Sequence, residues 1–115
     1  MTIRRLKTYT GSQGFVYQYY FVGMRSAKPD RIEYIFDVTS DRKTTFAVSV
    51  FLAREVAAAW ADSHGRALTD AEQYAAVKLR LFSAFDELPD MQSSGRELHI
   101  DISTLEASLA TLGVD

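Results

Sequence analysis

Residues 15–22 read Phe-Val-Tyr-Gln-Tyr-Tyr-Phe-Val, and every second residue from Phe15 to Phe21 is aromatic. Successive side chains of a β-strand point to opposite faces of the sheet. Phe15, Tyr17, Tyr19 and Phe21 would therefore line one face together. A strand with such an aromatic face places a sheet at the centre of the fold and needs other elements to cover that face.

The first half of the chain predicts four strands, at residues 5–10, 15–24, 31–39 and 43–51. Short polar turns join them, and the first turn contains two glycines, which adopt the positive φ values of tight hairpins readily. We expect Thr10 to pair with Phe15 across this turn, so that Leu6 lies opposite Tyr19. Four consecutive strands with short turns form an antiparallel meander.

The second half of the chain changes to helical spacing. Residues 52–63 carry apolar side chains at helical intervals, and Gly65 follows as a stop signal. Residues 69–72 read Thr-Asp-Ala-Glu, a capping box that opens a second helix. We expect this helix to end at Leu88, directly before Pro89.

The last segments predict one more strand and one more helix. Residues 97–102 form a short strand, residues 103–106 a second capping box, and Gly113 a C-cap. The predicted fold class is α+β: a four-stranded antiparallel meander followed by two helices, a short fifth strand and a C-terminal helix. The helices pack on one sheet face, and residues 1–115 form a single domain.

The aromatic sheet face is the expected core. We expect the buried residues to include Tyr34, Phe36, Phe46, Trp60 and Phe85. The assumed register gives the opposite face a mixture of basic, aromatic and polar side chains, with Glu33 and Asp37 among them. The candidate binding residues on this opposite face are Arg5, Lys7, Tyr9, Gln18, Tyr20 and Ile35.

Charge is unevenly distributed along the 115 residues, whose formal net charge is −2. Residues 1–43 carry a net charge of +4 and residues 44–115 a net charge of −6. Such asymmetry can mark an anionic partner or head-to-tail self-association, and it also arises by chance in small proteins. The chain contains no cysteine, no visible secretory signal and no apolar run near the roughly 20 residues of a membrane helix. We expect a cytoplasmic protein that does not enter membranes.

No motif in the chain predicts catalysis. His99 and Asp101 stand two residues apart on a predicted strand, a spacing that also occurs in general-base sites but is common on surfaces. His64 has no second histidine three or four residues away, so a helix-dipole role is favoured over metal binding. The glycines at residues 11–14 link two strands and form no phosphate loop. We expect no catalytic residue, no metal ligand and no cofactor.

Three functions are compatible with this reading. The favoured hypothesis is a small non-catalytic binding domain that acts through a sheet face and associates with a second copy or another protein. The first alternative is single-stranded nucleic-acid binding through the tyrosines, arginine and lysine of that face. The order of four strands followed by helices resembles that of single-strand-binding folds of the Whirly and Pur type, a resemblance that covers element order alone. The second alternative is a small-molecule pocket between sheet and helices.

Overall fold

A computed structural model describes residues 6–12 and 14–114. The five strands form one sheet in the order β1-β2-β3-β4-β5. They are β1 (Lys7–Thr10), β2 (Val16–Ala27), β3 (Arg31–Thr39), β4 (Phe46–Ala53) and β5 (Glu97–Ile100). The first four strands pair antiparallel, as predicted, and β5 joins β4 in parallel after a helical crossover. The α+β class is confirmed.

Among the described residues, three of the four helices begin at a side-chain cap, whereas the first begins after Ala53 without one. They are α1 (Arg54–His64), α2 (Asp70–Glu87), the short α3 (Met91–Ser94), which the sequence pattern did not predict, and α4 (Ile102–Thr111). The capping box of Thr69 and Glu72 is present at the start of α2, and Gly65 ends α1 with a φ of 74°. The second predicted capping box is wrong. Asp101 caps α4 instead, and its carboxylate accepts a hydrogen bond from the Thr104 backbone N–H at 2.7 Å.

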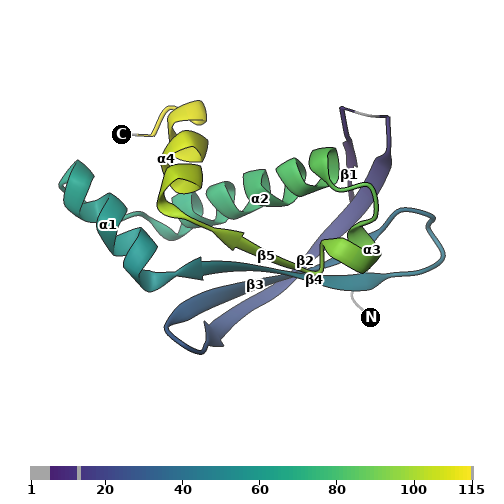
Figure 1. Cartoon of the computed structure of the whole chain (residues 1–115), viewed down its shortest axis with the longest axis horizontal. Coiled ribbons are helices and arrows are strands. Elements are labelled where there is room, and N and C mark those ends of the chain that lie inside the picture. The colour runs from purple at the N-terminus through teal and green to yellow at the C-terminus, as the bar shows by residue number, and fades with distance from the viewer. Residues whose placement is uncertain (1–5, 13, 115) are drawn as a thin grey trace.

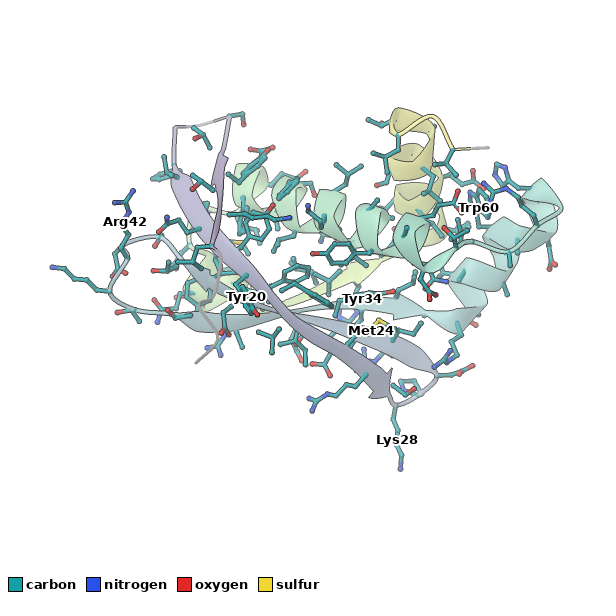
Figure 2. All side chains as sticks on the ribbon, turned by 180° about the vertical axis from the view of Figure 1, so that it is seen from behind. Tyr20, Met24, Lys28, Tyr34, Arg42 and Trp60 are labelled. Atoms are coloured by element: carbon teal, nitrogen blue, oxygen red, sulfur yellow. The ribbon has the colours of Figure 1, made fainter. Side chains whose placement is uncertain are left out.

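The helices α1, α2 and α4 all lie on one face of the sheet, as Figure 1 shows. Between them and the sheet lies the core, which buries all five predicted residues: Tyr34, Phe36, Phe46, Trp60 and Phe85. Figure 2 shows Tyr34 between sheet and helices, whereas Lys28 and Arg42 project from two loops. Phe15 departs from the prediction, because it precedes β2 and remains 50% exposed.

The register of the first hairpin differs from the prediction by one residue. Gly11 N–H donates a hydrogen bond to the Phe15 carbonyl at 2.8 Å, so Gly11 and not Thr10 lies opposite Phe15. Lys7 consequently pairs with Tyr19, and Tyr9 with Tyr17. A shift of one residue moves every side chain of a strand to the other face. Lys7 and Tyr9 therefore lie on the helix-covered face, and their predicted place on the opposite face is wrong.

A β-bulge at Val22 changes which side chains of the long strand β2 face the core. Before the bulge Phe21 lies opposite Phe36 in the core, and after it Gly23 lies opposite Ile35 on the uncovered face. The extra residue also increases local twist, which suits the curled shape of the sheet. None of the described helices is long and apolar enough to cross a membrane.

Candidate functional site

The sheet face opposite the helices is the first candidate site, and we call it the open face. No helix of residues 6–12 and 14–114 lies over it in Figure 1. Directly paired residues share a face, so the pairings identify its members. On the three long strands these are Val16, Gln18, Tyr20, Gly23, Arg25 and Ala27 of β2, Arg31, Glu33, Ile35, Asp37 and Thr39 of β3, and Ala47, Ser49, Phe51 and Ala53 of β4. Glu97 and His99 of β5 continue it at one edge.

A hydrogen-bonded charge cluster occupies the middle of the open face. Arg25 Nε donates to the Glu33 carboxylate at 2.8 Å, and the Ser49 hydroxyl donates to its other oxygen. The Glu33 side chain is only 11% exposed, whereas that of Arg25 is 68% exposed. The bonds from Arg25 and then Ser49 hold the pKa of Glu33 below its usual range. The central carboxylate is thus already satisfied within the protein.

A row of stacked groups lies beside this cluster. The guanidinium carbon of Arg31 lies 3.8 Å from the Phe51 ring centroid, and the Phe51 ring stacks on His99 with centroids 5.2 Å apart. Phe51 is consequently buried although its strand position faces outward. No hydrogen bond joins His99 to Asp101 among the described residues, and the Asp101 carboxylate serves as the α4 cap. The arrangement has the features of a packed surface and lacks those of a general-base dyad.

Exposed apolar side chains concentrate on the β1–β2 ribbon. Leu6, Val16 and Val22 are 45–48% exposed, and Val16 belongs to the open face. Tyr20 and Ile35 lie on the same face in half-buried positions. This end of the open face therefore combines apolar and aromatic side chains with the polar Gln18 and Asp37, whereas the middle carries the Arg25–Glu33 pair.

The structure brings together only half of the predicted binding residues. Gln18, Tyr20 and Ile35 share the open face. Lys7 and Tyr9 lie on the other face, as the register requires, and Arg5 falls outside the described residues. The predicted combination of tyrosines between lysine and arginine is thus absent from the open face as described.

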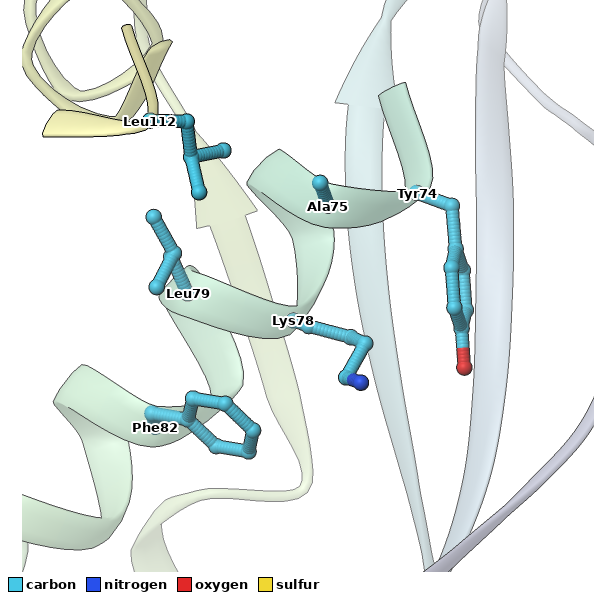
Figure 3. A pocket seen from close by; sticks show the side chains of 6 residues that line it. All are labelled: Tyr74, Ala75, Lys78, Leu79, Phe82 and Leu112. Carbon is cyan, nitrogen blue, oxygen red and sulfur yellow. The ribbon is translucent and has the colours of Figure 1, made fainter. Parts of the chain in front are cut away.

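A second candidate site, which sequence reasoning missed, lies along α2. Tyr74, Lys78 and Phe82 project to the same side of the helix, and Figure 3 shows the Lys78 side chain between the two rings. The Lys78 ammonium lies 5.7 Å from the Tyr74 centroid, 5.9 Å from Phe82 and 6.0 Å from Tyr19. These distances lie in the range of cation–π attraction.

Lys7 of β1 lies nearby, beside Tyr19 and Tyr74, two of the rings that surround Lys78. Partial burial and the nearby Lys7 ammonium lower the pKa of Lys78 from its usual value. No carboxylate of residues 6–12 and 14–114 lies within ion-pair distance of either lysine. Two cations therefore meet without a described counter-charge.

A hollow of about 240 Å³ opens beside Lys78, and we call it the lysine–aromatic hollow. Its lining residues are Tyr74, Ala75, Lys78, Leu79, Phe82 and Leu112. A smaller hollow of about 130 Å³ adjoins Tyr74 on the side of Lys7, Tyr19 and Phe21. The sequence signal was a lysine with aromatic residues four positions before and after it, a spacing that places all three on one helix stripe.

Metal binding finds no support in the described residues, because no group of three or more His, Asp or Glu among them could hold an ion. Comparisons with protein-family models, with curated proteins and with solved structures find no match. Function is therefore inferred from the geometry of the open face and of the lysine–aromatic hollow.

Proposed function

We propose that this protein is an interaction domain that pairs with a second copy of itself through the open face. The observation that carries the proposal is the exposed apolar surface of the β1–β2 ribbon, next to Tyr20 and Ile35, on a face that no described helix covers. Exposed apolar and aromatic side chains mixed with polar ones on an uncovered face are typical of protein–protein contacts.

A second copy suits this surface because the contact is compatible with two-fold symmetry. In a two-fold interface the same patch meets itself, so an apolar patch is self-complementary and a strongly charged patch repels itself. The charged side chains of the open face nearly balance, with Arg25 and Arg31 against Glu33, Asp37 and Glu97. Arg25 and Glu33 are also paired within the chain, so their burial leaves no unmatched ion at that point.

Single-stranded nucleic acid fits the open face less well. Its Arg25 is bound to Glu33 and its Arg31 lies on Phe51, so neither of these two described cations is readily available for phosphates. Lys7, which the nucleic-acid hypothesis needs, lies on the opposite face. The expected cytoplasmic location stays a prediction.

The test is the molar mass in solution across protein concentration, measured by light scattering and sedimentation. We expect a dimer for the wild type and a monomer for Tyr20→Asp, because a charge buried in an apolar contact is costly. Val16→Asp adds the same charge at a more exposed position of the patch and should act alike. Ala58→Asp, on the exposed surface of α1, is the matched control and should remain dimeric.

Circular dichroism and urea titration show whether each variant is folded. A wild type that stays monomeric at millimolar concentration overturns the proposal. So does a folded Val16→Asp variant that dimerises as strongly as Ala58→Asp. Salt-sensitive binding of a single-stranded oligonucleotide by the monomer would instead favour nucleic-acid recognition.

A further inference from the structure

Lys78 of the lysine–aromatic hollow and the nearby Lys7 create an unusual electrostatic environment. Lys78 is held among three aromatic rings, and Lys7 of β1 lines the adjoining smaller hollow with two of those rings, Tyr19 and Tyr74. A partly buried cation loses hydration, and a like charge nearby adds repulsion. Attraction to the ring faces offsets only part of this cost. A bound anion would remove the repulsion between the two ammonium groups.

The walls of the hollow determine what else the anion must carry. Apart from Lys78, every lining residue is apolar or aromatic: Tyr74, Ala75, Leu79, Phe82 and Leu112. Figure 3 shows Leu112, from the turn after α4, facing Leu79 across the hollow. Such walls favour a flat apolar body next to the charge.

Size and lining also argue against other ligands. The hollow of about 240 Å³ lies below the usual range of drug-sized pockets, so the ligand must be small. Among the described lining residues there is no arginine to grip a phosphate with two parallel hydrogen bonds. A metal ion or an organic cation would be repelled by the two lysines.

We infer that the lysine–aromatic hollow binds a small aromatic monocarboxylate. The carboxylate lies at the ammonium groups of Lys78 and Lys7, and the ring lies against Tyr74, Phe82 and Leu79. This site is on the helix-covered side of the β1–β2 ribbon, so the inference stands whether or not the open face forms a dimer.

The experiment compares benzoate and naphthoate with their neutral amides, benzamide and naphthamide, by heteronuclear NMR titration and calorimetry. Each amide keeps the ring of its acid and loses the charge. The full-length wild type should bind naphthoate with shifts confined to the amides of Ala75, Leu79, Leu112 and their neighbours. It should prefer naphthoate to naphthamide by about tenfold or more, because a hydrogen bond to a charged group contributes more than a neutral one.

Lys78→Met is the decisive variant, since methionine keeps an unbranched apolar stem and removes only the ammonium. Its preference for naphthoate over naphthamide should disappear, with naphthoate affinity down by about tenfold or more. Lys43→Met removes the same charge from the exposed β3–β4 loop and should bind like the wild type. Thermal midpoints confirm that both variants fold.

Three results would overturn the inference. The first is the absence of localised shifts at millimolar naphthoate. The second is equal binding of naphthoate and naphthamide by the wild type. The third is a folded Lys78→Met variant that keeps the carboxylate preference, which would mean that Lys78 only covers apolar surface with its stem.

Discussion

The Tyr9 ring of β1 stacks on the Phe82 ring of α2, with centroids 4.4 Å apart and planes 6° from parallel. The Tyr9 hydroxyl also donates a hydrogen bond to the Asp86 carboxylate at 2.8 Å, one helical turn further along α2. The other Asp86 oxygen accepts the Ser12 backbone N–H at 2.8 Å. One helix therefore anchors both the strand β1 and the turn that follows it.

Two variants separate the contributions of the Tyr9 ring and hydroxyl. Tyr9→Phe keeps the stack and loses the hydrogen bond, so we expect a loss of about 1 kcal/mol in the free energy of unfolding. Tyr9→Ala also loses the stack and its apolar burial and should cost clearly more. Urea titration measures both. Equal losses in the two variants would show that the ring contributes nothing.

The position of Tyr9 also shows where sequence reasoning stopped. In β1, lysine and tyrosine alternate with two threonines, so neither face of this short strand is distinctly more apolar. Which face of β1 lies towards the helices then depends on the turn. The Gly11–Phe15 hydrogen bond, together with Gly14 at a φ of 88°, produces a three-residue connection there. Hydrophobicity cannot choose between turns that differ by one residue, and that difference exchanged the two faces.

Longer sequence patterns predicted the structure correctly where the periodicity of the sequence matches the burial of its residues. The alternation of Tyr34, Phe36 and Val38 predicted the core face of β3 correctly, as did the capping box that starts α2. The lysine–aromatic hollow was not predicted because an apolar stripe along a helix indicates core packing, whereas Lys78 lies at the edge of that stripe. Whether an edge residue is covered depends on the neighbouring strand, which periodicity does not reveal.

Core truncations should be costly at two sites on opposite sides of the sheet–helix contact. Phe36→Ala in β3 and Phe85→Ala in α2 each remove a fully buried ring. We expect each to lower the free energy of unfolding by about 3–5 kcal/mol, from lost transfer energy and the remaining cavity. Phe15→Ala is the matched control, because its ring is half exposed, and should cost less than about 1 kcal/mol. A control as costly as the core variants would contradict the assignment of faces.

Removing Arg25 and removing Glu33 should lower the stability of the fold by different amounts. Arg25→Met leaves the nearly buried Glu33 carboxylate with Ser49 as its remaining partner, whereas Glu33→Met returns an already exposed arginine to water. Uncompensated charge is costly where solvent is excluded. We expect Arg25→Met to destabilise the fold more than Glu33→Met, with urea midpoints as the measurement. The reverse order would show that the Glu33 carboxylate is well solvated.

The last prediction concerns acid stability and the start of α2. The Arg66 guanidinium donates two hydrogen bonds of 2.9 Å to the Glu72 carboxylate, and the Thr69 backbone N–H donates another at 2.9 Å. These bonds, with Arg66 the larger cause, lower the pKa of Glu72 from 4.5 to about 2. Because the folded-state pKa is depressed, the stabilisation is present above the ordinary glutamate pKa and is lost as pH falls towards about 2.

Glu72→Gln should therefore be less stable than the wild type at neutral pH, and the difference should shrink steadily over that acidic window. Urea midpoints measured at successive pH values test this, and the same substitution in an Arg66→Gln background should have a smaller effect, since the two residues act as a pair. A difference that stays constant with pH would mean that the capping bond to Thr69, and not the charge of Glu72, carries the effect.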